Sequence, residues 1–129
     1  KYGTEVQSMS EAKVENWFWA NGIRCIYEPQ IVIGDEVFLP DWVLLPQHGI
    51  DKPVIIEYWG LCRDDHTLAK WALKKKPKYI ERKDFKESIY NGSNNYYYIG
   101  VYPQELNQLE VILFQKLQNL GWSPSESES

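Results

Sequence analysis

Apolar side chains near the start of the chain recur at three- and four-residue intervals. Val14, Trp17 and Phe18 have this spacing within the segment 8–22, which begins at a serine and closes at Gly22. A helical period with a capping residue at its start and glycine at its end is typical of an amphipathic helix. The pattern therefore predicts a helix over residues 8–22.

The pattern then changes to runs rich in β-branched and aromatic residues, which favour strands. Three such runs cover residues 23–34, 36–45 and 54–59. The first is interrupted at Pro29, and the second contains Pro40, which indicates an edge or a bulge because proline lacks the N–H of a ladder. The third is almost continuously apolar, as in a strand covered on both faces. We expect three strands in succession.

The second half of the chain alternates between helical and strand patterns. A helix is predicted from residue 64 or 65 up to Pro77, and the following segment 78–95 reads either as its continuation or as a loop. Residues 96–102 have strand composition, and leucines at helical intervals over 104–122 predict a last helix that stops at Gly121.

The predicted order is helix, three strands, helix, strand, helix, or αβββαβα. A helix between the third and fourth strands permits a parallel crossover, so we expect an α/β fold with a central mixed four-stranded sheet flanked by helices. With 129 residues the chain is long enough for one domain with a real core. We assign residues 1–122 to that domain and expect residues 123–129, a serine- and glutamate-rich end, to be a disordered tail.

Composition narrows the class of protein. No stretch approaches the roughly eighteen uncharged residues of a membrane helix, so a soluble protein with no membrane partner is expected. Two cysteines form no disulfide framework, which indicates reduced thiols and a cytoplasmic location.

Basic residues are concentrated in one segment of a chain whose net charge is −4. Most of them lie between residues 70 and 86, where only Glu81 and Asp84 oppose them. Such a patch suits a polyanion such as nucleic acid, and a solvated helix face is the alternative interpretation. The side chains expected to contact nucleic acid are Lys70, Lys74, Lys76, Lys78, Arg82 and Lys83.

Three acids stand out: Glu11 in the predicted first helix, and Asp41 and Glu57 within apolar strand patterns. A desolvated carboxylate requires a proton, a basic partner or a cation. If the second and third strands are neighbours, Asp41 and Glu57 would share an oxygen-rich site for Mg²⁺ or Mn²⁺. The alternative interpretations are a favourable helix-dipole contact for Glu11 and a turn or bulge for Asp41.

The dipeptide Pro40-Asp41, followed after an apolar run by Glu57-Tyr58-Trp59, resembles the signature of the PD-(D/E)XK nuclease superfamily. The likeness extends to a branch of that superfamily that is often fused to superfamily 1 helicases, whose third-strand motif reads E-Y/H-W/F-G. It covers most of residues 8–117. The matching residues are Ser8, Glu11, Gly22, Ile23, Tyr27, Glu28, Pro40, Asp41, Glu57 and Gly60.

The resemblance implies a restriction-endonuclease-like fold and a DNA endonuclease that depends on Mg²⁺ or Mn²⁺. It assigns Asp41 and Glu57 as metal ligands and Glu11 as a third ligand or a partner of the metal's water shell. Trp59 replaces the third-strand lysine of the signature, and in this branch a lysine from the following helix takes over within a K-x-x-x-Y pattern. Lys75 and Tyr79 have that spacing, with Lys70, Lys74 and Lys76 as competitors.

The implied partner is DNA, with little sequence readout because phosphate contacts do not distinguish bases. A helicase or another domain of a longer chain and a homodimer are also compatible with this family. The rival hypothesis is a nucleic-acid-binding or protein-interaction module that has lost catalysis on the same fold. Cleavage of RNA, recognised through its 2′-OH, is a third reading.

Overall fold

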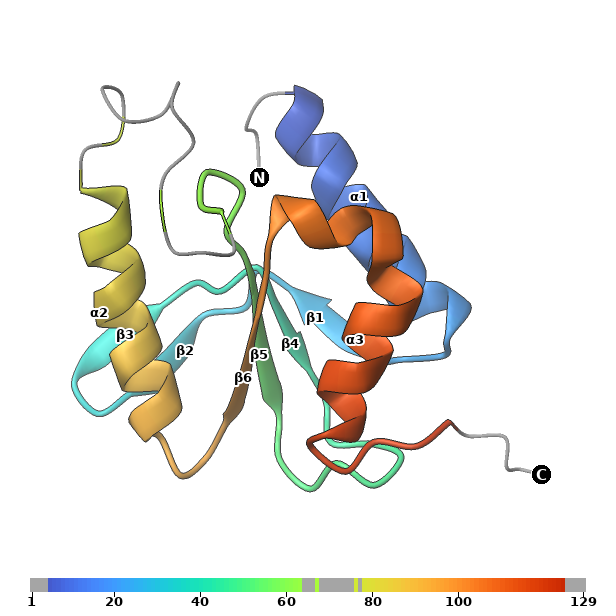
Figure 1. The fold of residues 1–129 in the computed structure, drawn as a ribbon. Helices are drawn as coiled ribbons and strands as arrows, with labels where there is room; N and C mark the ends of the chain where they lie inside the picture. The colour runs from blue at the N-terminus through green and yellow to red at the C-terminus, as the bar shows by residue number, and fades with distance from the viewer. Residues whose placement is uncertain (1–4, 64–66, 68–75, 77, 125–129) are drawn as a thin grey trace.

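The computed structural model describes residues 5–63, 67, 76 and 78–124. Figure 1 shows its helices and strands. In chain order these are α1 (Glu5–Ala20), β1 (Cys25–Tyr27), β2 (Ile31–Ile33), β3 (Glu36–Phe38), β4 (Trp42–Leu44), β5 (Val54–Tyr58), α2 (Tyr79–Gly92), β6 (Tyr97–Val101), the 3₁₀ helix η2 (Pro103–Gln108) and α3 (Leu109–Gln118).

The central sheet has four strands in the order β1-β4-β5-β6. The β1–β4 and β4–β5 pairs are antiparallel, and the β5–β6 pair is parallel. Helix α2 covers one face of this sheet, and α1 and α3 cover the other (Figure 1). The predicted α/β architecture with a mixed four-stranded sheet and flanking helices is confirmed.

Strand β5 is buried along its whole length, which explains its almost continuous run of apolar residues. Val54 and Ile56 join the core cluster under α1 and α3. Ile55 points the other way and packs in a second cluster with Tyr90 of α2. Because side chains alternate between the faces of a strand, Glu57 lies on the α2 side together with Ile55.

The first two predicted strands are each divided in the structure. Residues 23–34 form β1 and β2, and residues 36–45 form β3 and β4, so that β2 and β3 pair only with each other as a separate hairpin. The breaks fall at Pro29 and Pro40, which cannot donate to a ladder. Glu28, with a φ of 50°, turns the chain just before the first break.

The structure after β5 adds detail to the helices predicted for this part of the chain. The helix expected over 64–76 lies almost entirely outside the described residues. The segment that reads as helix or loop forms α2 up to Gly92. The predicted last helix is divided into η2 and α3, and it ends before Gly121, whose φ is 107°.

Two further expectations concern membranes and the end of the chain. None of the helices formed by the described residues has the length and apolarity needed to cross a membrane. The backbone N–H of Ser123 donates to the carbonyl of His48 at 2.8 Å, so the chain is still attached to the domain at the start of the expected tail. Residues 125–129 lie outside the described part.

Candidate active site

Asp41 and Glu57 face each other at one end of the β4–β5 pair. The register pairs Trp42 with Ile56, and continuing it by one position opposes Asp41 to Glu57. Side chains directly opposed on antiparallel strands lie on the same face, within a few ångströms of each other. The structure therefore brings together the two acids that the sequence singles out, although fifteen residues separate them in the chain.

Both carboxylates are buried and each has a donor on a named oxygen. Asp41 is 3% exposed, and its Oδ2 accepts the backbone N–H of Tyr58 at 2.7 Å. Glu57 is 4% exposed, and its Oε2 accepts the hydroxyl of Tyr90 at 2.7 Å. These donors offset part of the cost of removing two carboxylates from water.

The two carboxylates also act on the same tyrosines of α2. Burial raises the pKa of Tyr90 above its usual range, and the charges of Glu57 and Asp41 raise it further. The pKa of Tyr79 is raised in the same way, first by burial and then by nearby charges that include Asp41 and Glu57. The acid pair is thus enclosed by α2 as well as by the strand ends.

Glu11 approaches this end of the sheet from α1. It is buried, and its Oε1 accepts the hydroxyl of Tyr27, in β1, at 2.9 Å. Burial raises the pKa of Tyr27, and the hydrogen bond and charge of Glu11, followed by the charges of Glu28 and Asp41, raise it further. The phenol of Tyr27 therefore lies within electrostatic reach of both Glu11 and Asp41.

The donor set suits a small hard cation. Mg²⁺ and Mn²⁺ prefer oxygen ligands, and Mg²⁺ is commonly held by one or two carboxylates together with waters and substrate phosphates. Asp41 and Glu57 supply such a pair. Across the described residues, no three His, Cys, Asp or Glu side chains are grouped closely enough to hold a metal ion, so the role of Glu11 as a third ligand stays a prediction.

The lysines expected to serve the reaction are placed only in part. Lys70, Lys74 and Lys75, which include the assigned catalytic lysine, lie outside the described residues. Lys76 is exposed. Trp59, in place of the signature lysine, is 6% exposed, and its Nε1 donates to the hydroxyl of Tyr98 at 2.7 Å.

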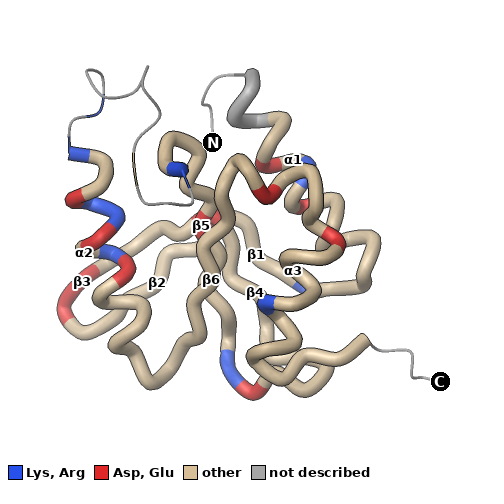
Figure 2. The backbone as a smooth tube through the Cα atoms, viewed as in Figure 1, with Lys and Arg blue, Asp and Glu red and all other residues tan. Residues whose placement is uncertain are grey.

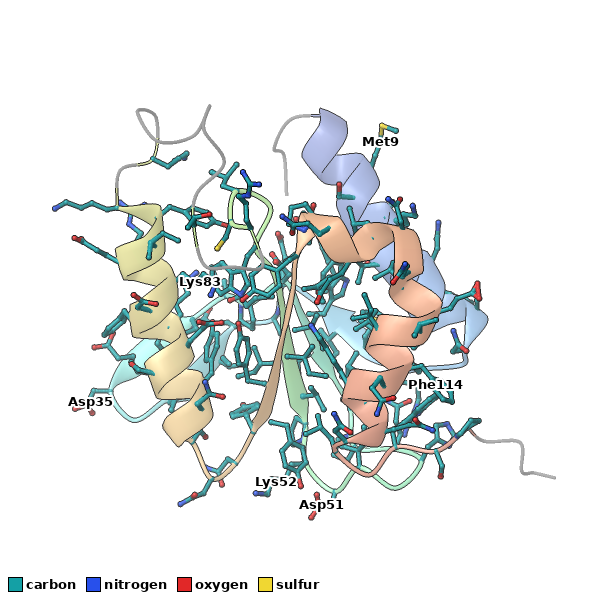
Figure 3. The ribbon with its side chains drawn as sticks, viewed as in Figure 1. Met9, Asp35, Asp51, Lys52, Lys83 and Phe114 are labelled. Atoms are coloured by element: carbon teal, nitrogen blue, oxygen red, sulfur yellow. The ribbon has the colours of Figure 1, made fainter. Side chains whose placement is uncertain are left out.

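Lys83 is buried, whereas the sequence places it among the surface contacts to nucleic acid. It is 2% exposed and points from α2 toward the sheet (Figure 3). Its Nζ donates to Glu87 Oε1 at 2.9 Å and lies 5.5 Å from the ring centroid of Trp59 and 5.2 Å from that of Tyr102. Burial lowers the pKa of Lys83, but hydrogen bonds to Tyr102 and Glu87, together with the charges of these residues, raise it above its usual value, so the ammonium remains charged.

The sheet-facing side of α2 is a polar stripe that sequence reasoning missed. Tyr79, Lys83, Glu87 and Tyr90 follow one another at intervals of four, four and three residues. This spacing places them on one face of a helix, and it is the sequence feature from which the stripe could have been predicted. The stripe joins the acid pair to a hydrogen-bonded cluster in which the hydroxyl of Tyr98 donates to Glu87.

Alkaline pH is expected to lower the free energy of unfolding. The pKa values of Tyr79, Tyr90 and Tyr98 are raised in the folded protein, each mainly by burial. Their contribution is complete below the ordinary tyrosine pKa of about 10 and is lost above it, because the unfolded chain ionises first. Urea unfolding at successive pH values should show this decline, and Tyr90→Phe should make it shallower. A flat profile above that pH would contradict the assignment.

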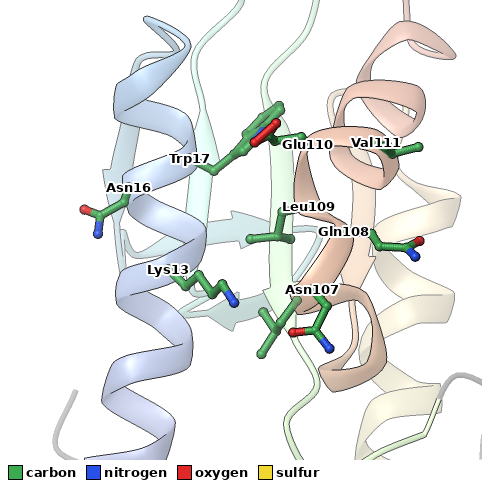
Figure 4. A pocket seen from close by; sticks show the side chains of 9 residues that line it. Lys13, Asn16, Trp17, Asn107, Gln108, Leu109, Glu110 and Val111 are labelled. Carbon is green, nitrogen blue, oxygen red and sulfur yellow. The ribbon is translucent and has the colours of Figure 1, made fainter.

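A groove in the described structure lies away from the acid pair. A groove of about 520 Å³ runs between α1 and the η2–α3 corner, lined by residues that include Lys13, Trp17, Asn107 and Leu109 (Figure 4). These elements cover the face of the sheet opposite to α2, and the groove shares no residue with the acid pair. This groove is therefore separate from the acid pair.

No family model matches this chain, and no curated protein or solved structure matches it either. The site is interpreted from its own residues. These are two buried carboxylates opposed on neighbouring strands, a third acid held by Tyr27, and a helix that combines a polar inner stripe with basic outer residues.

Proposed function

We propose that this domain is a DNA endonuclease that depends on Mg²⁺ or Mn²⁺ and hydrolyses phosphodiester bonds with little sequence readout. The observation that supports it most is the opposition of Asp41 and Glu57 at the end of the β4–β5 pair, both buried and on the face that α2 covers. The resemblance of the motifs around these acids to the PD-(D/E)XK signature agrees with this proposal.

Each described residue of the site has a definite part in this proposal. Asp41 and Glu57 hold the cation, which when bound supplies Lewis-acid activation of the phosphate and a more acidic attacking water. The Tyr58 N–H and the Tyr90 hydroxyl fix the orientation of the two carboxylates. Glu11, oriented by Tyr27, adds negative charge at the same end of the sheet. The lysine that assists the water is assigned to Lys75.

The outer side of α2 provides contacts for the phosphate backbone. Lys78 and Arg82 are exposed, Lys86 is half-buried, and basic positions alternate with acidic ones along the helix (Figure 2). The same helix presents Tyr79 and Tyr90 to the acid pair. Contacts from these exposed side chains to phosphate would position DNA on the domain without reading its sequence.

Arg82→Gln is expected to weaken DNA binding and to reduce the slope of log K against log salt by about 1, because one exposed phosphate contact is lost. Lys83→Met is the matched comparison, since the neighbouring Lys83 is buried and engaged with Glu87. It should leave the slope unchanged. Fluorescence anisotropy with labelled duplex at several salt concentrations measures both. A slope that responds to Lys83→Met and not to Arg82→Gln would refute this division of roles.

The proposal is tested by titrating Mg²⁺ and Mn²⁺ against linear, branched and single-stranded DNA, with RNA of the same sequences in parallel. We expect cleavage of DNA that rises with either ion and stops on addition of a chelator. DNA binding without cleavage at any ion concentration would instead favour the binding-module hypothesis, to which the replacement of the signature lysine by Trp59 also points. Cleavage confined to RNA would instead indicate a ribonuclease that recognises the 2′-OH.

A further inference from the structure

Tyr90 holds one defined oxygen of Glu57. Its side chain is fully buried, and its hydroxyl donates to Glu57 Oε2 at 2.7 Å. The ring is fixed between Phe38 and Tyr98, whose ring centroids each lie 5.3 Å from its own. A phenol has an ordinary pKa of about 10, so it is protonated at neutral pH and its hydroxyl is a donor. Oε2 is therefore engaged by a buried, closely packed donor.

Asp41 is held in a similar way by the backbone. Its Oδ2 accepts the N–H of Tyr58, which belongs to β5 and cannot move without disturbing the sheet. In each carboxylate one oxygen is thus occupied by a buried donor. A binding mode in which both oxygens of Asp41 or Glu57 coordinate one ion has to compete with these hydrogen bonds.

This competition affects cations differently. Ca²⁺ takes six to eight oxygens in flexible geometry and often uses both oxygens of a carboxylate, whereas Mg²⁺ requires a near-octahedral shell and keeps several waters. A carboxylate that coordinates through one oxygen suits Mg²⁺ and suits Ca²⁺ less well. The hydrogen-bond donors around the acid pair therefore influence which metal ion binds there.

We propose that Tyr90 determines metal specificity by keeping Glu57 to coordination through a single oxygen, which favours Mg²⁺ and Mn²⁺ over Ca²⁺. This inference rests on the proposed function, because it concerns the same carboxylates. Tyr90 acts through Glu57 and is a positioning residue.

The test is a comparison of Mn²⁺ and Ca²⁺ affinities for the whole chain and for Tyr90→Phe. Free Mn²⁺ is followed by electron paramagnetic resonance, and Ca²⁺ is measured by its displacement of Mn²⁺. Removing the hydroxyl should lower the ratio of the Ca²⁺ to the Mn²⁺ dissociation constant by about threefold to tenfold, as expected for the typical net contribution of one hydrogen bond. Circular dichroism verifies that the variant is folded.

Tyr98→Phe is the matched control. Its hydroxyl donates to Glu87, and its ring contacts that of Tyr90. The substitution therefore removes a hydroxyl from a neighbouring tyrosine and leaves the hydrogen bond to Glu57 in place. The control should leave the ratio unchanged. An unchanged ratio in Tyr90→Phe, or an equal weakening of both ions, would overturn the inference while leaving the metal site standing.

Two further outcomes complete the test. If the native chain binds no Mn²⁺, the proposed function fails, and the inference fails with it. Carboxylate stretching bands in the infrared difference spectrum of Mn²⁺-loaded against metal-free native protein need no variant. A wide separation of the antisymmetric and symmetric bands is expected for coordination by one oxygen, and a narrow separation, typical of coordination by both oxygens, would overturn the role of Tyr90.

Discussion

Replacing Asp41 with asparagine is expected to lower the rate of metal-dependent DNA cleavage by at least about a thousandfold, or ~4 kcal/mol of transition-state stabilisation. Asparagine keeps a side-chain carbonyl that can accept the Tyr58 N–H, which Asp41 accepts at 2.7 Å, so the strand pairing should survive. The negative charge needed to hold a divalent cation is lost. Initial cleavage rates at saturating Mg²⁺ measure the effect, and urea unfolding verifies that stability is retained.

Asp51→Asn is the matched control for this substitution. Asp51 is an exposed acid whose Oδ1 accepts the hydroxyl of Tyr97 at 2.7 Å, so the same change is made at a hydrogen-bonded aspartate away from the β4–β5 strand end. Its cleavage rate should equal that of the native chain. A folded Asp41→Asn protein that cleaves at a rate comparable to the native chain would remove Asp41 from the reaction.

Trp42→Ala is expected to reduce the free energy of unfolding by about 4 kcal/mol, as for other large aromatic residues truncated in a core. Trp42 is fully buried, its Nε1 donates to Glu15 Oε1 at 2.9 Å, and its ring lies 5.8 Å from that of Phe18. The substitution would leave a cavity between β4 and α1 as well as a carboxylate that has lost its donor. Chemical denaturation followed by far-ultraviolet circular dichroism gives the value.

The comparison for Trp42 is a second tryptophan at the opposite extreme of exposure. Trp19 is 77% exposed, so Trp19→Ala should change stability by no more than about 0.5 kcal/mol. Equal losses from the two substitutions would mean that Trp42 is not packed as described. Because Trp42 follows Asp41 directly, a loss of cleavage in Trp42→Ala would be interpreted only together with the stability measurement.

The predictable part of the fold is the part in which local pattern and burial agree. Strand β5 follows from a run of apolar residues, and α1 follows from helical spacing closed at Gly22. The hairpin of β2 and β3 could not be predicted, because the same β-branched residues suit the main sheet and a separate ribbon. Only the turns at Pro29 and Pro40 decide between the two, and their direction depends on the packing around them.

The residues of the site likewise fall into those that the sequence could identify and those that it could not. Asp41 and Glu57 were identifiable because a carboxylate within an apolar run is costly to bury and indicates a partner. Tyr90 was not identifiable, since it lies 33 residues from Glu57 and a tyrosine on an amphipathic helix usually indicates core packing. Arg82 and Lys83 are adjacent basic residues that the sequence treats alike, yet the aromatic rings around Lys83 and its pairing with Glu87 separate their roles.

The register of β4 against β5 limits how the chain can change in length. The connection 45–53 is closed by a backbone bridge between Gln47 and Ile50, and the Gln47 side chain also bonds to the carbonyl of Arg24. Shifting the pairing by one residue would turn Asp41 and Glu57 to opposite faces. Single-residue insertions or deletions in this connection should therefore be tolerated far less well than substitutions, because they act on the pairing that holds the two acids on one face.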